Sequence, residues 1–201
     1  MNDSQLRETY LSGETIYDGK VVHLEKWEVL LPNGAKAARE VVKHVGAAAI
    51  VPVDDEGFVT LVRQHRVAID EVTLEIPAGK LNFKGEDPLV CAKRELEEET
   101  GLNAARWQML THSVTTPGFC TEQIGLFLAT GLTQHEAHTD EDEFLNLVRL
   151  PLSEAVARVM AGEIRDMKSA LGLLMADRAL RAAEKPFEAL HSTIQRPLPP
   201  A

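Results

Sequence analysis

The sequence predicts an α+β protein in which a mixed sheet lies between helices, an α/β/α sandwich, preceded by a small antiparallel meander. Three observations support this. Residues 13–44 alternate in the manner of strands, further strand-like runs follow, and helix-like segments are interspersed among them after residue 85. Because strands and helices are mixed along the chain, we expect helices to cover the faces of the sheet.

The first strand-like region forms the predicted meander. Its strand-like runs are interrupted by turn residues at 18–19 and 32–34, and the runs cover residues 15–17, 21–24 and 27–31. We expect residues 1–44 to form this arm, residues 45–185 the main domain, and the proline-rich residues 186–201 a loose tail.

The main domain opens with a predicted hairpin. Residues 47–53 and 58–62 flank a turn at 54–57, and the first run is apolar throughout, which is typical of a strand buried on both faces. Later segments are predicted in the order strand, helix, strands and helices. The strands are 71–74, 107–110, 124–129 and 144–150, and the helices are 88–100, 152–161 and 166–183.

The helix at 88–100 carries an unusual density of acid. Asp87 suits its N-cap, Pro88 its first position and Gly101 the turn past its end. Leu89, Ala92 and Leu96 fall on one apolar face. The other positions carry four glutamates within five residues, behind a single arginine: Arg94, Glu95, Glu97, Glu98 and Glu99.

Such crowding has two explanations, an ordinary solvated acidic face, which is the usual case for acidic helices, and a bound cation. Glu95 neighbours Glu98 and Glu99 on the helix, and like charges at this spacing are destabilising unless something neutralises them. Hard divalent cations such as Mg²⁺ and Mn²⁺ prefer carboxylate oxygens and are commonly shared with the phosphates of a substrate. From the acidic helix alone, a metal site and a solvated face therefore both stay open.

The pattern extends beyond the helix and resembles the Nudix box. Gly79, Glu86, Arg94-Glu95-Leu96, Glu98-Glu99 and Gly101-Leu102 match its glycine, its spaced glutamate and its Arg-Glu-aliphatic-x-Glu-Glu-x-Gly-aliphatic core. One departure is visible, because six residues separate Gly79 from Glu86 where the family has five. We expect a surface loop to absorb the extra residue.

The resemblance implies a Nudix-type sandwich fold and specific roles. It implies that Glu95 and Glu99 are the principal metal ligands, that Glu98 is a further ligand, and that the Ala78 carbonyl oxygen contributes. Mg²⁺ is the implied cofactor, for which Mn²⁺ can substitute. Catalytic roles fall to Arg94, which orients a glutamate of the box, to Glu98, and to Glu141, which takes a proton from the attacking water, with Glu143 as the alternative base.

A second stretch is similar to the ADP-ribose pyrophosphatase subgroup of that family. Pro117 and Phe119 lie in a Thr-Thr-Pro-Gly-Phe context about fifteen residues past the box, as in that subgroup. The similarity extends upstream to Arg63, Arg66 and Glu75, and it implies that all five residues contact or support the substrate. From the residues alone, a structural salt bridge stays open as the role of Arg63 and Arg66. Trp27 is open between two readings, core packing and stacking on the adenine.

The resemblance therefore implies Mg²⁺-dependent hydrolysis of the diphosphate of ADP-ribose to AMP and ribose 5-phosphate. Three alternatives remain open: hydrolysis of another nucleoside diphosphate sugar, hydrolysis of an oxidised nucleotide, and a sensor that binds ADP-ribose without cleaving it. The family resemblance also implies a homodimer that exchanges N-terminal strands.

Composition restricts partners and compartment. The formal net charge of −10 argues against nucleic-acid and membrane surfaces, which require clustered Lys and Arg. The two cysteines, Cys91 and Cys120, form no CxxC motif, and the N-terminus lacks the pattern of a secretory signal. We therefore expect a cytoplasmic protein that binds a small nucleotide-sugar substrate.

Overall fold

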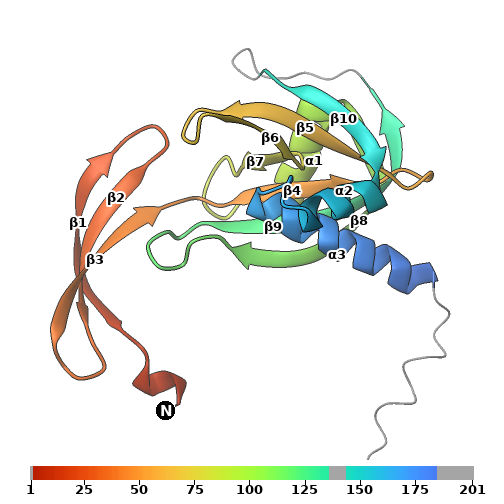
Figure 1. The fold of residues 1–201 in the computed structure, drawn as a ribbon. Coiled ribbons are helices and arrows are strands. Elements are labelled where there is room, and N and C mark those ends of the chain that lie inside the picture. Colours follow the sequence, from red (N-terminus) through yellow and green to blue (C-terminus); the bar gives the residue numbers. More distant parts are fainter. Residues whose placement is uncertain (1, 136–143, 185–201) are drawn as a thin grey trace, which may run out of the picture.

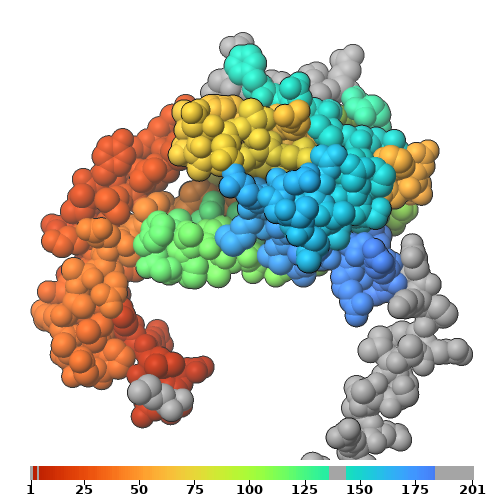
Figure 2. Space-filling view, in the orientation of Figure 1, coloured from red at the N-terminus to blue at the C-terminus, as the bar shows by residue number. Residues whose placement is uncertain are grey.

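The computed structural model describes residues 2–135 and 144–184 of the chain. It consists of a body of sheets and helices and an N-terminal sheet that stands beside the body (Figure 1). In the space-filling view the N-terminal sheet projects from the body as a separate limb (Figure 2). Within the described residues, no helix is both long enough and apolar enough to cross a membrane.

The N-terminal sheet confirms the predicted meander. After a short 3-10 helix at Asp3–Gln5, strands β1 (Thr9–Asp18), β2 (His23–Leu30) and β3 (Lys36–Lys43) pair antiparallel in the order β1-β2-β3. Strand β2 joins the strand-like runs at 21–24 and 27–31 into one strand. Two backbone hydrogen bonds join the end of this sheet to the body, from Val42 N–H to Phe119 O (2.7 Å) and from Thr121 N–H to Val42 O (3.0 Å).

The body contains two sheets. The first has the order β7-β4-β9-β8 and comprises β4 (Ala47–Pro52), β7 (Ala78–Lys80), β8 (Leu102–Val114) and β9 (Gln123–Gln134). It is mixed, because β4 and β9 run parallel while the other pairs are antiparallel. The second is antiparallel, has the order β10-β5-β6, and comprises β5 (Phe58–Arg66), β6 (Glu71–Glu75) and β10 (Asn146–Pro151).

The predicted hairpin at 47–62 is wrong beyond its turn. The turn forms, with Asp54 N–H donating to Phe58 O and Gly57 N–H to Asp54 O (both 3.0 Å). Beyond it, β4 and β5 share a single bridge between Val53 and Val59 and then separate into different sheets. The reason is that both edges of β4 are occupied, by β7 on one side and by β9 on the other.

Three α-helices of the described residues complete the sandwich. Helix α1 (Pro88–Thr100) packs on one face of the mixed sheet over a core that includes Ile50, Leu96 and Phe127. Helices α2 (Leu152–Met160) and α3 (Met167–Glu184) cover a second core that includes Leu61 and Leu173. The predicted fold class, a mixed sheet with helices on its faces preceded by a meander, is confirmed (Figure 1).

Candidate active site

Helix α1 begins and ends as its sequence predicts. The side chain of Asp87 accepts a hydrogen bond from Leu89 N–H (2.9 Å), and Pro88 is the first helical residue. Gly101 ends the helix with φ of 68°, a left-handed conformation that glycine adopts without steric cost, and its N–H donates to Glu97 O (2.8 Å). These caps fix the register of the acidic residues.

Two glutamates of α1 lie against strand β7. Glu99 accepts a hydrogen bond from Ala78 N–H (3.2 Å), and Glu95 lies over Gly79. A Cβ atom added to Gly79 would lie 1.9 Å from Cδ of Glu95, so only glycine leaves room for this carboxylate. Both glutamates are buried, at 9% and 4% exposure, and their carboxylates therefore face backbone rather than bulk water.

Arg94 neutralises part of this charge. Its Nη1 lies 2.6 Å from Glu95 Oε1 and donates to Glu98 Oε2 (3.0 Å), and its Nη2 donates to Lys80 O (3.3 Å). Burial lowers the pKa of Arg94, but the carboxylate charges of Glu95 and Glu98 and the hydrogen bond to Glu95 outweigh burial, so the pKa lies above its usual value. The guanidinium is therefore the local counter-charge for two glutamates of the box.

The residues around Gly79 suit a hard divalent cation. Among the described residues, no three side chains of His, Cys, Asp or Glu come together closely enough to hold a metal by themselves, and Glu98 is turned toward Arg94. However, two buried carboxylates, Glu95 and Glu99, lie beside the backbone at Ala78 and Gly79. Carboxylate, carbonyl and water oxygens make up the usual ligand set of Mg²⁺, so this donor set fits such an ion.

A cavity of about 690 Å³ adjoins this strand. It lies between the β5–β6 hairpin, strand β7 and the start of α3. Its lining is polar on several sides, and its charged or hydroxyl-bearing residues include Arg66, Thr73, Glu75, Thr115, Glu122, Asp166 and Lys168. Its size is that of a typical small-molecule site.

Glu75 is the most tightly held acid in the cavity. Arg66 donates two parallel hydrogen bonds to it, Nε to Oε1 (2.8 Å) and Nη2 to Oε2 (2.7 Å). Thr73 Oγ1 also donates to it (2.6 Å), and Lys168 forms an ion pair with it. Burial alone raises the pKa of Glu75, but these cations and hydrogen bonds outweigh it and lower the pKa to about 2. Glu75 is therefore an anion at neutral pH that orients Arg66.

The structure brings together some predicted site residues and separates others. Arg66, Glu75 and Ala78 line the cavity, and Glu99 and Glu95 contact the strand that forms its wall. The other predicted substrate contacts, Arg63, Pro117, Phe119 and Trp27, are not among its lining residues.

Pro117 and Phe119 lie in the turn that joins β8 to β9, and Phe119 is 54% exposed. Neighbouring Thr115 does reach the cavity, so this turn approaches the site without its predicted residues touching it. Both candidate bases, Glu141 and Glu143, lie outside the described residues.

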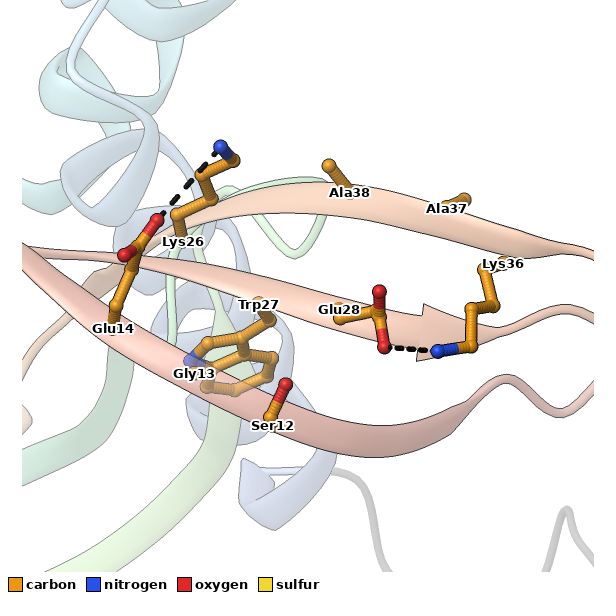
Figure 3. A pocket seen from close by; sticks show the side chains of 9 residues that line it. All are labelled: Ser12, Gly13, Glu14, Lys26, Trp27, Glu28, Lys36, Ala37 and Ala38. Atoms are coloured by element: carbon orange, nitrogen blue, oxygen red, sulfur yellow. Dashed lines mark hydrogen bonds and ion pairs between the residues drawn. The ribbon is translucent and has the colours of Figure 1, made fainter.

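Trp27 lies in the N-terminal sheet (Figure 3). Its indole packs edge-to-face on Tyr10, with ring centroids 5.2 Å apart, and its Nε1 donates to Glu25 (2.6 Å). It lines a pocket of about 540 Å³ on this sheet, over Gly13 and between the Glu14–Lys26 and Glu28–Lys36 ion pairs. Within one chain, Trp27 is thus separate from the cavity of Arg66 and Glu75.

The extra residue between Gly79 and Glu86 is accommodated in a tight turn. Gly85 has φ of 95°, and Glu86 N–H donates to Phe83 O (3.2 Å). The Glu86 carboxylate accepts a hydrogen bond from Asn82 N–H (2.6 Å). The loop therefore closes on itself directly before α1 and leaves the helix in register.

The cavity residues that sequence reasoning missed include Thr73, Asp166 and Lys168. Asp166 has a local signal, since its side chain accepts from Ser169 N–H (3.0 Å) at the start of α3, an N-cap arrangement that Asp-x-x-Ser predicts. Lys168 has none, because its partner Glu75 is 93 residues away in the chain.

The fold and the site together define a class of protein. It is an α/β/α sandwich in which strand β7, with Gly79, and the acidic helix α1 form an anionic site. Beside this site lies a cavity lined by Arg66, which is paired with Glu75. The model of the NUDIX domain matches residues 42–171. The chain therefore belongs to the Nudix family, and the resemblance seen in its sequence is confirmed.

Several similar proteins extend over most of the chain. An ADP-ribose pyrophosphatase of Bacillus subtilis (strain 168) is 41% identical and covers 88% of this chain and 97% of its own length. A methanol dehydrogenase activator of Bacillus methanolicus is 42% identical, with 83% and 90% covered. A solved structure titled as an ADP compounds hydrolase superposes with a TM-score of 0.77 at 23% identity, covering 88% and 96%, and so supports the fold.

Proposed function

We propose that this protein hydrolyses the diphosphate linkage of ADP-ribose to AMP and ribose 5-phosphate. The observation that carries the proposal is the cavity in which Arg66, held by Glu75, adjoins the strand that contacts Glu95 and Glu99. The proposal is supported by 41% identity to proteins named ADP-ribose pyrophosphatase from Bacillus subtilis and from Mycobacterium tuberculosis.

Arg66 is assigned to the diphosphate. Two of its N–H groups are used by Glu75, and Arg66 lines the cavity, where the remaining N–H groups of its planar guanidinium suit phosphate oxygens. Pro117, Phe119 and Arg63 remain predicted substrate contacts. Because they do not line the cavity, they would contact the substrate only if substrate binding moved them toward it or if a second chain supplied them.

Mg²⁺ is the proposed cofactor, with Mn²⁺ as a substitute. Glu95, Glu99 and the Ala78 carbonyl would hold it, and Glu98 would join once released from Arg94. When bound, such an ion neutralises the diphosphate and lowers the pKa of water. Arg94 keeps Glu95 in place, and Glu141, or Glu143 in its stead, takes the proton of the attacking water.

The proposed assembly is a cytoplasmic homodimer in which residues 1–44 form the exchanged arm, followed by the catalytic domain at 45–185 and a tail at 186–201. The support lies in strand β1, all ten residues of which are exposed. Its exposed side chains include Tyr10, Ile16 and Tyr17, at 53–59% exposure. Exchange would also give Trp27 a route to the substrate of the partner.

A second candidate substrate is another nucleoside diphosphate sugar. It is favoured by a relative from Cronobacter sakazakii, 34% identical over 66% of this chain, that is named GDP-mannose pyrophosphatase. The diphosphate contacts proposed above would serve either substrate equally. The choice between them therefore depends on contacts to the base and the distal sugar.

The test is chromatography of products after incubation with ADP-ribose, with and without Mg²⁺. GDP-mannose serves as the competing substrate, and Glu99→Gln as the variant that lacks one proposed ligand. We expect Mg²⁺-dependent AMP and ribose 5-phosphate, and a turnover about 10²–10³-fold lower in Glu99→Gln. Full turnover by a folded Glu99→Gln protein would refute the ligand assignment. Tight binding of ADP-ribose without products would favour the sensor alternative.

A further inference from the structure

The start of helix α3 is tied to the cavity through Lys168. The side chain of Lys168 is 15% exposed, and its ammonium group contacts Glu75 Oε2 and Asp166 Oδ2, the latter at 2.9 Å. Glu75 is 2% exposed, so water cannot readily replace a cation taken from it. Lys168 and Arg66 therefore share one buried carboxylate between them.

A second connection runs beside the first through the backbone. Asp166 Oδ2 accepts hydrogen bonds from Ser169 N–H (3.0 Å) and Ser169 Oγ (2.5 Å). Ser169 Oγ in turn accepts from Ile76 N–H (2.9 Å), and Ser169 is fully buried. The first turn of α3 thus holds both the side chain of Glu75 and the backbone of the next residue.

The segment held in this way leads directly into the acidic site. Pro77 O accepts from Ile50 N–H (2.9 Å), and Ala78 N–H donates to Glu99 (3.2 Å). Each residue from Glu75 to Ala78 is therefore fixed by a contact of its own. A change at Glu75 displaces Arg66 first, because the two share parallel hydrogen bonds, whereas Ala78 keeps its own contact with Glu99.

We propose that Lys168 is a positioning residue for the diphosphate: because it shares the single negative charge of Glu75 with Arg66, the positive charge of Arg66 is not fully compensated by Glu75 and remains available to phosphate oxygens in the cavity. This inference rests on the role of Arg66 in the proposed function. It assigns to the start of α3 a part in substrate affinity, although Lys168 itself acts through Glu75 and Arg66.

The expected signature is a loss of affinity with little loss of turnover. Without Lys168, the buried charge of Glu75 has Arg66 as its remaining cationic partner among the contacts described, so Glu75 compensates the charge of Arg66 and the attraction of the cavity for a diphosphate falls. Arg66 is assigned to binding in both ground and transition states, and loss of such uniform binding raises KM while kcat is retained.

The experiment uses the full chain as wild type, Lys168→Met, Lys168→Arg and the control Lys93→Met. Lys93 is an exposed lysine of α1 that does not line the cavity. Calorimetry with ADP in the presence of Mg²⁺ measures affinity for a diphosphate, and steady-state kinetics with ADP-ribose measures KM and kcat. We expect Lys168→Met to raise the ADP Kd and the KM at least fivefold with kcat within twofold. Lys168→Arg should recover at least half of the lost affinity, and Lys93→Met should match wild type.

Three results would overturn the proposal: an unchanged ADP Kd in Lys168→Met, a loss confined to kcat, or a loss that follows only the unfolded fraction seen by circular dichroism. Failure of the proposed function looks different. If wild type binds ADP in a Lys168-dependent manner but leaves ADP-ribose intact, the hydrolase proposal fails and the positioning role stands. If ADP-ribose is cleaved and Lys168→Met binds ADP as wild type does, the positioning role alone fails.

Discussion

The body and the N-terminal sheet differ in how many strand residues each buries. In the body, β4 buries five of its six residues and has neighbouring strands on both edges. In the N-terminal sheet, β1 buries none of its ten residues, and β2 and β3 each bury one, Val29 and Val41. A small sheet with so little cover is marginal in isolation. The strands around the site are therefore covered within a single chain, whereas the N-terminal sheet leaves exposed faces that the proposed exchange of residues 1–44 would cover.

Gly79→Ala in the body should have the largest effect, a loss of catalytic efficiency. The new Cβ would lie 1.9 Å from Cδ of Glu95, and therefore either the carboxylate or strand β7 must move. Because Glu95 is a proposed metal ligand, we expect kcat/KM for ADP-ribose to fall by about 10²-fold or more. Steady-state kinetics over a range of Mg²⁺ concentrations measures the loss.

Gly34→Asn is the matched control in the N-terminal sheet. Gly34 has φ of 81° and no atom within 4 Å of an added Cβ, and asparagine tolerates this conformation better than most residues. Its kcat/KM should stay within twofold of wild type. Near-normal activity in Gly79→Ala would show that catalysis does not depend on the position of the Glu95 carboxylate over residue 79.

The acidic helix of the site could be predicted from the sequence because the residues that set its ends act locally. Asp87, Pro88 and Gly101 each act on neighbouring backbone, so the bounds of α1 follow from the sequence. The separation of β4 from β5 was not predictable from their turn, since it depends on β9, more than 70 residues away in sequence. Lys168 was missed for the same reason, because its contact with Glu75 exists only once α3 has packed.

Acid should weaken the body through Glu75. Its pKa of about 2 in the folded protein lies below the ordinary value of 4.5, so its stabilising effect is complete above about pH 4.5 and is lost as the pH falls toward 2. The full effect is on the order of 3 kcal/mol. Between pH 6 and pH 3, urea unfolding of wild type should therefore lose more free energy of unfolding than that of Glu75→Gln, which has no such charge to titrate.

Glu71→Gln provides the control on the same strand, because Glu71 pairs with Arg165 at the surface, where its side chain is 47% exposed. Its pH dependence should follow that of wild type. If Glu75→Gln also follows wild type from pH 6 to pH 3, the depressed pKa of Glu75 is wrong.

Ile16→Asp in the N-terminal sheet should weaken the proposed dimer. Ile16 is 53% exposed on β1, and a charge there would be buried in the proposed dimer. We expect the dimer dissociation constant to rise at least tenfold, as measured by light scattering across a dilution series. Met160→Asp, at a 74% exposed position of α2 in the body, should leave the mass unchanged. If the wild-type chain, or a chain lacking residues 1–40, is monomeric and active, then activity does not require the proposed dimer.

The smallest effect is expected from an ion pair that matches the Glu75 pair in distance but not in environment. Lys36 Nζ lies 2.7 Å from Glu28 Oε1, the same separation as between Arg66 Nη2 and Glu75 Oε2. The side chains of the first pair are 64% and 46% exposed, whereas that of Glu75 is 3% exposed. Since water competes for exposed charges, Lys36→Met should change the free energy of unfolding by no more than about 0.5 kcal/mol, against several for Glu75→Gln. Urea unfolding at pH 7 measures both, at a protein concentration that keeps the oligomeric state constant. Equal losses in the two variants would mean that the N-terminal sheet is as tightly held as the body, and that the contrast drawn from exposure does not extend to energy.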